Sequence, residues 1–149
     1  MIIITISPPL SELAAKIQED IHGSVKSGVY YLAEAIREKA QAEAPVRTSN
    51  LVNSIAPPYL SDDGMVATIK ATAKYAKWVH RGTGIYGPYK TPVVPVTKKA
   101  LFWAGAMHPV KNVKGMKPNP FFTRAVAATD VQEVFKNAVQ RYLTSKGDN

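Results

Sequence analysis

Three glycines in the middle of the sequence have the spacing of a nucleotide-binding loop. They are Gly82, Gly84 and Gly87 in the stretch YAKWVHRGTGIYGP, and they form the pattern G-x-G-x-x-G. In a dinucleotide-binding site this pattern follows a strand and begins a helix, whose N-terminus meets the pyrophosphate. The strand is expected here, because the residues of Tyr75–Arg81 fall into two alternating sets, as they would on the two faces of a strand.

The helix that such a site needs is not expected. Pro88, Pro92 and Pro95 follow the glycines closely, and no helix begins across them. A P-loop is excluded as well, because no Lys-Ser or Lys-Thr pair follows the glycines. We therefore predict that Gly82 and Gly84 serve the backbone. They allow unusual φ and ψ angles, or a close approach of two chain segments, where the strand runs into an extended loop.

Histidine is the best candidate for acid/base chemistry in this sequence. His80 lies beside Arg81 and near Lys77 and Tyr75, and a metal-free ribonuclease could use such a set. His80 would then transfer protons while a cation stabilises the phosphorane. We favour the alternative, in which His80 simply packs beside Trp78 on one face of the strand. The three histidines of the chain are too far apart to give the spacing of metal ligands.

The composition is that of a globular protein with a single domain over residues 1–149. Of the 149 residues, 46% are hydrophobic and 20% are charged, which is enough for one core. The absence of cysteine excludes disulfides and thiolate metal sites. Met1–Thr5 is too short for a signal peptide and no run reaches transmembrane length. We therefore expect a protein made in the cytoplasm, with no membrane partner.

Positive charge is concentrated in the middle of the chain. The net charge is +8, and no Asp or Glu occurs from Gly64 to Thr129, a stretch that holds eleven Lys and Arg residues. Such a region attracts polyanions or acidic protein surfaces, although an ordinary solvated surface is the simpler explanation. Contacts with DNA or an acidic partner are predicted for Lys70, Lys74, Lys77, Lys98 and Lys99.

A nucleic-acid-binding module is therefore an alternative function. Aromatic residues interleave with the basic ones and could stack on bases while lysines bind phosphates. No fold-specific nucleic-acid motif accompanies them. Trp78, Phe102 and Trp103 are residues of the kind found more often in a core than on a stacking surface.

The expected elements give an α+β fold. Apolar residues three and four apart predict a long amphipathic helix over 9–44, after an N-terminal arm over 1–8. Ser7 and Pro8 are its start signal, Pro45 ends it, and Gly23 and Gly28 are points where it could bend.

The remaining elements are a small antiparallel sheet and a closing helix. The segment 46–118 is predicted to contain strands over 65–72 and 75–81, the extended loop, a short helix over 98–107 and an extended arm over 108–114. A C-terminal helix over 120–144 follows, with Asn119 as its N-cap, and 145–149 form a loose tail.

Four short segments, in this order, carry a resemblance to a known family. Its pattern reads roughly A-P-v-r-T-G-x-L-x-x-S-I, then Y-A-x-x-v-e-x-G-T, then a P-x-x-x-K-A-L-x-F block and G-x-x-P-x-P-F. The corresponding segments here are Ala44–Ile55, Tyr75–Pro88, Pro95–Phe102 and Gly115–Phe122. Over nearly its whole length the chain resembles the neck and tail-component proteins of siphovirus-type bacteriophages and their prophages.

Two positions depart from the family pattern. Ser49 stands where glycine is usual, which is a mild change at a turn. The pair His80-Arg81 stands where an acidic-aromatic pair is common. The positive charge there implies that contacts with partners differ from those of many relatives.

The resemblance implies a structural protein of the virion, without catalysis or cofactor. Long N-terminal and C-terminal helices would pack on a small antiparallel sheet that carries an extended Gly/Pro-rich loop. Such proteins complete the tail or join it to the head. By the same resemblance they would form homo-oligomeric rings around the DNA channel, with contacts to other neck, connector and tail proteins and to the DNA in the channel. Predicted subunit contacts are a loop of Arg81, Gly82, Thr83, Gly84, Ile85, Tyr86, Gly87, Pro88, Tyr89 and Lys90, and an arm with Lys111, Lys114, Lys117 and Pro118.

Overall fold

The computed structural model describes residues 10–46 and 49–147 of the chain. The fold is α+β, as predicted, with a long N-terminal helix, a C-terminal helix and a small antiparallel sheet. Contacts divide the chain into two compact units, whose described residues are 10–37, 57–69 and 129–147 in the first and 38–46, 49–56 and 70–128 in the second. The single domain expected from the chain length stays a prediction. The N-terminal arm and its cap at Ser7-Pro8 lie outside the described residues.

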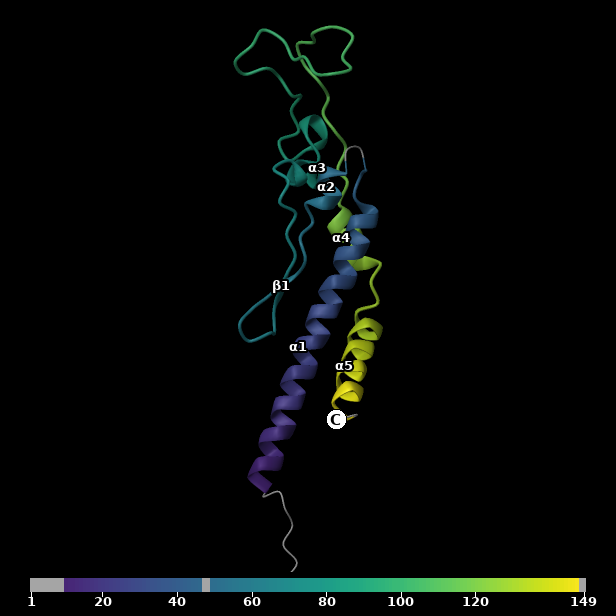
Figure 1. Ribbon diagram of the computed structural model, residues 1–149. Coiled ribbons are helices and arrows are strands. Elements are labelled where there is room, and N and C mark those ends of the chain that lie inside the picture. The colour runs from purple at the N-terminus through teal and green to yellow at the C-terminus, as the bar shows by residue number, and fades with distance from the viewer. Residues whose placement is uncertain (1–9, 47–48, 148–149) are drawn as a thin grey trace, which may run out of the picture. The chain divides into compact units, whose positions relative to one another are not determined.

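The long helix α1 runs over Leu10–Glu43, within one residue of its predicted limits (Figure 1). Its 34 residues correspond to about 51 Å at 1.5 Å per residue. The helix ends at Glu43, two residues before Pro45, as expected because proline has no amide proton and disfavours a helical conformation in the residue before it. It is not interrupted at Gly23 or Gly28.

The first unit is built on the packing of α1 against α5, which runs over Val131–Gly147 (Figure 1). Gly23 and Gly28 of α1 allow this packing. A Cβ atom on Gly28 would lie 2.5 Å from the Phe135 ring, and one on Gly23 would overlap the Tyr142 hydroxyl. The ammonium group of Lys146 in α5 adds an ion pair to Asp20 at 3.3 Å. The two glycines are therefore contact points for α5.

A short hairpin completes the first unit. Strands β1 (Tyr59–Leu60) and β2 (Ala67–Thr68) pair antiparallel, with Tyr59 opposite Thr68. The prediction of a strand over 65–72 was therefore partly right. Its predicted pairing with 75–81 was wrong, because its partner precedes it in the chain.

Residues 75–81 form a helix, which corrects the predicted strand. Helix α3 covers Ala76–Arg81. Ala76 and Val79 are buried and His80 is half-buried, so the inward residues are three and four apart. The two-residue alternation seen in the sequence was accidental over so short a segment.

The predicted helix over 98–107 is also absent. This segment instead turns back on itself, since Leu101 and Val110 form an antiparallel bridge with N–O distances of 2.8 and 3.0 Å. The turn includes Gly105, whose φ is +96°. The extended arm expected over 108–114 is confirmed, since it supplies the partner strand of this bridge and of a second one, between Val93 and Val113.

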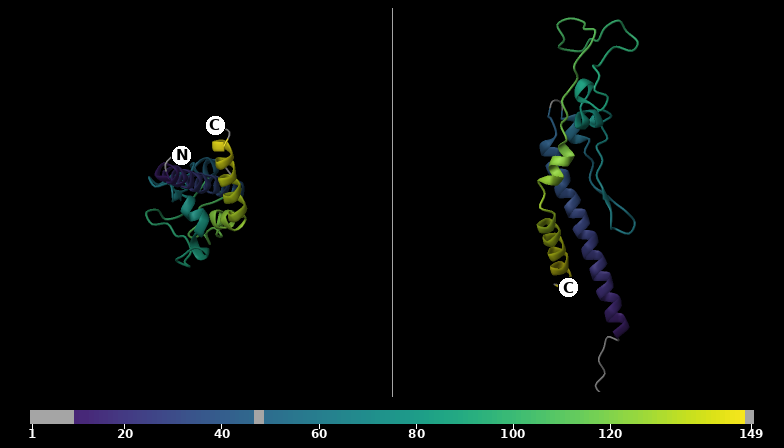
Figure 2. Two further views of the ribbon diagram at one scale, coloured as in Figure 1. Left: turned by 90° about the horizontal axis from the view of Figure 1, so that it is seen from below. Right: turned by 180° about the vertical axis from the view of Figure 1, so that it is seen from behind.

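The single C-terminal helix predicted over 120–144 is two helices. Helix α4 covers Phe121–Ala127, and the chain leaves the helical conformation before α5 begins (Figure 2). The Asp130 carboxylate accepts a bond from the Glu133 amide at 3.0 Å, so Asp130 caps α5. Helix α5 continues to Gly147, which makes most of the expected tail helical. Asn119 does not cap α4, because its side chain accepts a bond from Arg124.

The second unit has a small core to which α3 and α4 both contribute. Leu51 from helix α2 (Asn50–Asn53), Ile55, Val79, Phe121 and Ala125 are all buried. At its edge the Arg124 guanidinium binds the Glu43 carboxylate at 2.7 Å, which joins α4 to the last turn of α1. This core holds α3 and the start of α4 in fixed positions, and both contribute to the site described next.

Candidate functional site

Hydrogen bonds join the predicted contact loop to the predicted contact arm. Thr83 donates its amide to the Met116 carbonyl at 2.9 Å, and Ile85 donates to the Lys114 carbonyl at 2.8 Å. The Thr83 hydroxyl in turn accepts a bond from the Met116 amide at 2.9 Å. With the Val93–Val113 and Leu101–Val110 bridges, these bonds make residues 83–116 a two-stranded ribbon.

Glycine makes the base of this ribbon possible, as the sequence predicted. Gly82 and Gly84 have φ of +78° and +64°, in the left-handed region. A Cβ on Gly82 would lie 2.8 Å from the Met116 carbonyl oxygen, and one on Gly84 would overlap the Lys114 carbonyl. Both functions proposed for these glycines, unusual angles and close approach, are therefore confirmed. The loop begins with a 3-10 turn, η1 (Gly84–Tyr86), which is incompatible with a nucleotide-binding helix.

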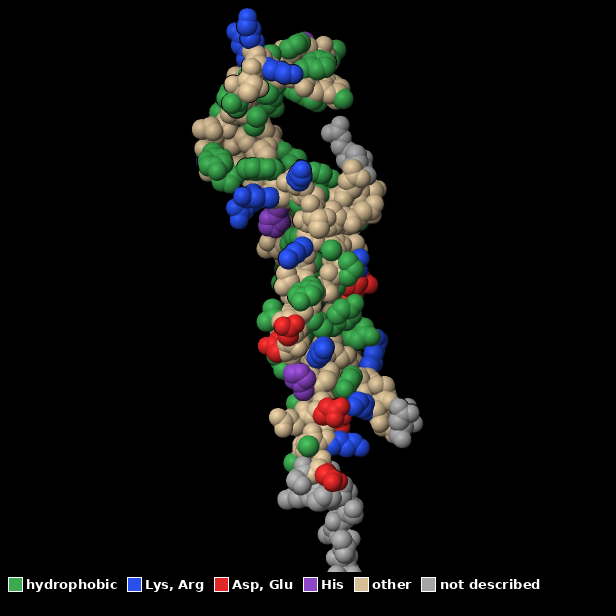
Figure 3. Space-filling model, turned by 60° about the vertical axis from the view of Figure 1, so that its left-hand side comes forward, with side chains coloured by type: hydrophobic (Ala, Val, Ile, Leu, Met, Phe, Trp, Pro, Cys, Tyr) green, Lys and Arg blue, Asp and Glu red, His purple; other side chains and the backbone are tan. Residues whose placement is uncertain are grey.

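The outer part of the ribbon exposes many hydrophobic side chains. Val96 and Met107 are 95% and 97% exposed, and Tyr89 and Phe102 are exposed as well. In the space-filling view, green hydrophobic side chains cover much of this segment at the top, with blue Lys and Arg side chains among them (Figure 3). Nearer its base, Trp78, Tyr89 and Val94 help to line an apolar groove of about 630 Å³.

The basic residues predicted to contact partners are all exposed. This holds for Arg81 and for the nine lysines at 70, 74, 77, 90, 98, 99, 111, 114 and 117. All of them belong to the second unit, whose residues include thirteen Lys and Arg but only two acids, Glu38 and Glu43. The first unit has six basic and nine acidic residues. Charge is thus strongly segregated between the two units.

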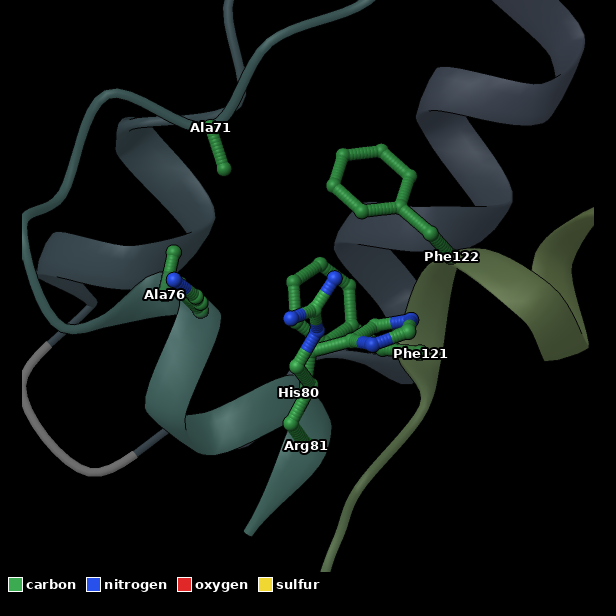
Figure 4. Close-up of a pocket in the computed structure, with 7 residues that line it drawn as sticks. Ala71, Ala76, His80, Arg81, Phe121 and Phe122 are labelled. Carbon is green, nitrogen blue, oxygen red and sulfur yellow. The ribbon is translucent and has the colours of Figure 1, made fainter. Parts of the chain in front are cut away.

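A pocket of about 250 Å³ lies where α3 meets the start of α4 (Figure 4). We call it the cationic pocket. Three basic side chains of α3 line it together with apolar groups of Ala71, Ala76, Phe121 and Phe122. The basic residues are Lys77, His80 and Arg81.

Contacts with α4 orient the histidine of the cationic pocket. The His80 ring meets the Phe121 ring edge to face, with centroids 5.6 Å apart. Its Nε2 atom lies 3.5 Å from the Thr123 hydroxyl. The Lys77 ammonium lies 5.6 Å from the centre of the Trp78 ring. The predicted packing of His80 beside Trp78 is replaced by packing against Phe121.

The lining of the cationic pocket suits binding better than acid/base catalysis. It contains no carboxylate and no second histidine that could share proton transfer with His80. Cations around an apolar floor attract an anion that carries a hydrophobic group. Sequence reasoning found the three basic residues but missed Ala71 and the two phenylalanines. Of these, Phe121 and Phe122 belong to the P-x-P-F segment, which signalled the family rather than a pocket.

Two kinds of function find no support in the described part of the chain. Within 10–46 and 49–147, no three His, Cys, Asp or Glu side chains gather closely enough to bind a metal ion. None of the helices described there is both long enough and apolar enough to cross a membrane.

Comparison with known proteins gives a family. A family model described as "Bacteriophage HK97-gp10, putative tail-component" matches residues 9–82. The chain is thus similar to the HK97-gp10-like family over just under half of its length. The match covers α1 to α3 and the hairpin, and it ends one residue before the ribbon. No curated protein and no solved structure matches the chain. The phage tail-component family inferred from the sequence motifs is thereby confirmed.

The family assigns a coarse function. HK97-gp10-like proteins are bacteriophage tail components, which are structural proteins of the virion.

Proposed function

We propose that this protein completes the tail of a bacteriophage or joins the tail to the head. It acts in several copies around the DNA channel in the neck region, through contacts between copies and with other neck, connector and tail proteins. It has no catalytic role and no cofactor. The ribbon and its groove are the main contact surfaces.

The ribbon carries this proposal. Its base is fixed by main-chain bonds from Thr83 and Ile85 to the opposite strand. Its outer part nevertheless exposes Val96, Phe102 and Met107 to solvent. Several exposed apolar side chains on one segment that is held in place are typical of protein interfaces. The tail-component family supplies the setting in which the interface is used.

The test is a phage whose copy of this protein is inactivated and then supplied from a plasmid. In one variant a short turn replaces residues 95–111, which leaves the Val93–Val113 bridge and the ribbon base in place. We expect free heads and free tails in electron micrographs and a loss of infectivity. Leu143→Ser, at an exposed apolar position of α5 outside the ribbon, is the control and should restore joined particles. Joined, infectious particles with the shortened ribbon would contradict the proposal.

A nucleic-acid-binding function is the second candidate. The thirteen basic residues of the second unit, set against two acids, favour it. If the unit binds DNA through phosphate contacts, the affinity must fall steeply as the salt concentration rises. A fluorescence titration with double-stranded DNA at several salt concentrations tests this. An affinity that hardly changes with salt would exclude it.

A further inference from the structure

The cationic pocket has no counter-ion within its own unit. Among the described residues, neither Lys77 nor Arg81 is paired with a carboxylate. The unit has two acids, and one of them, Glu43, is already bound by Arg124. An anion for the pocket must therefore come from elsewhere.

The size and lining of the pocket define that anion. A volume of about 250 Å³ is smaller than the roughly 300–1,000 Å³ of a typical ligand site. One or two side chains would fill it. The apolar floor formed by Phe121 and Phe122 calls for a hydrophobic group beside the carboxylate. A peptide turn with both kinds of side chain meets these requirements.

The hairpin of the first unit presents such a turn, residues 61–66, which we call the acidic turn. Asp62 and Asp63 are exposed there, next to Met65 and Val66, which are 45% and 58% exposed. Among the described residues, neither carboxylate has a Lys or Arg partner. The acidic turn is therefore complementary to the cationic pocket in charge and in apolar character.

The acidic turn is also preorganised. The Ser61 amide donates to the Val66 carbonyl at 2.8 Å, and the Val66 amide donates to the Ser61 hydroxyl at 3.0 Å. The Asp63 carboxylate accepts bonds from the Ser61 hydroxyl and from the Met65 amide. Gly64, with φ of +70°, lies against the side chain of Lys26 in α1. A rigid turn loses little conformational entropy on docking.

We propose that the acidic turn of one copy docks in the cationic pocket of a second copy. Asp62 and Asp63 would meet Lys77 and Arg81, while an apolar side chain of the turn covers the phenylalanines. The inference rests on the proposed function, because it needs copies that assemble. Turn and pocket are different surfaces, so each copy can bind one neighbour through each. A head-to-tail contact of this kind closes into a ring when its rotation allows.

Disulfide trapping tests the contact directly, because the chain has no cysteine of its own. One protein carries Asp62→Cys, in the turn, and the other carries Lys77→Cys, in the pocket. We expect the mixture, under mild oxidation, to give a cross-linked heterodimer faster than either protein gives a homodimer. Lys136→Cys, at an exposed position of α5, replaces Lys77→Cys in the control and should not cross-link.

The same pairs are then tested in particles assembled with both variants. Absence of the heterodimer in solution and in particles would overturn the proposal. Cross-linking of the pocket cysteine to a different virion protein would also overturn it and would assign the pocket to that protein.

Charge reversal provides a second, independent measurement. Asp62→Lys and Arg81→Glu should each weaken self-association at least about tenfold, because like charges would then face each other. Mixing the two variants should restore most of the association, since the reversed charges complement each other across one contact. Circular dichroism verifies that both variants are folded.

Two outcomes separate this inference from its alternatives. Oligomers that persist in both variants would overturn the turn-in-pocket contact and leave the proposed function standing. If Arg81→Glu weakens DNA binding while Asp62→Lys leaves self-association unchanged, the pocket is a DNA-binding site and the proposal fails.

Discussion

At the scale of single residues, glycine determines where chain segments can meet. Gly28 admits Phe135 between the two long helices, and Gly84 admits the opposite strand at the ribbon base. These positions are sensitive to a single added methyl group, because interiors are close-packed and adjust only partly.

Gly84→Ala should destabilise the ribbon. The new Cβ would overlap the Lys114 carbonyl and would also need φ near +64°, at a combined cost of about 1–3 kcal/mol. Hydrogen exchange at the Ile85 amide should accelerate. Gly105→Ala is the matched control, because its φ is +96° but no atom lies within 4 Å of the new methyl. If both changes accelerated exchange at the Ile85 amide equally, the close approach of Gly84 to Lys114 would not explain the effect.

Gly28→Ala should destabilise the protein although alanine favours helices by about 1 kcal/mol. Overlap with the Phe135 ring outweighs that gain, so we expect a net loss of about 1–3 kcal/mol in the free energy of unfolding. Urea denaturation measures it. The double variant with Phe135→Leu should recover part of the loss. If Gly28→Ala alone stabilised the protein, α5 would not pack against α1 at this position.

Asp63 gives the acidic turn a defined pH dependence. The Asp63 carboxylate accepts hydrogen bonds from the Ser61 hydroxyl, which has the larger effect, and from the Met65 amide. Both bonds hold the pKa of Asp63 below its ordinary value. Because the folded pKa is the lower one, the stabilising effect is complete above the unfolded pKa of about 4 and is lost as the pH falls through the folded pKa. In an NMR titration, Ser61→Ala should raise the pKa of Asp63. The control, Ser145→Ala in α5, should leave it unchanged, and an unchanged value in Ser61→Ala would refute this explanation.

At the scale of elements, long patterns were predictable and short ones were not. The limits of α1 followed from apolar residues repeated over nine turns and from Pro45. Residues 75–81 satisfied a period of two and a period of 3.6 equally well, and burial of Ala76 and Val79 decided for the helix. The angles of Gly82 and Gly84 could be anticipated from residue type. The strand that they approach, about 30 residues further along the chain, could not be anticipated in this way.

The division between α4 and α5 is a local signal that sequence reading missed. Thr129 is buried and Asp130 caps α5, whereas the apolar stripe alone suggested one helix. Asp130→Ala should therefore cost about 1 kcal/mol in the free energy of unfolding, within the usual range for an N-cap. Thermal or urea denaturation measures this. Asp130→Asn, which keeps an acceptor, should cost much less, and equal losses would argue against capping.

At the scale of the whole molecule, charge is the property that segregates most clearly. Residues of the first unit sum to −3 and those of the second to +11, from nine acids against six bases and two acids against thirteen bases. Copies that associate head to tail through these surfaces attract each other electrostatically. Such attraction is screened over about 8 Å at physiological salt.

Self-association should therefore weaken as salt is raised. Analytical ultracentrifugation from low to high sodium chloride should show a falling average mass, because screening acts on the charged contact. The charge-reversed Arg81→Glu protein is the control and should respond much less. Association that strengthens with salt would indicate an interface dominated by apolar surface, such as the groove near Tyr89 and Val94.

The anchoring of the ribbon has a consequence for how such proteins diversify. Two of the three bonds at its base join only main-chain atoms, and the third needs a single hydroxyl, that of Thr83. Between Ile85 and Lys114 the side chains contribute little to that anchor. This interval can therefore be exchanged for sequences of different length and chemistry while the parent fold is preserved. It is a segment whose side chains can vary while the main-chain bonds at its base stay the same.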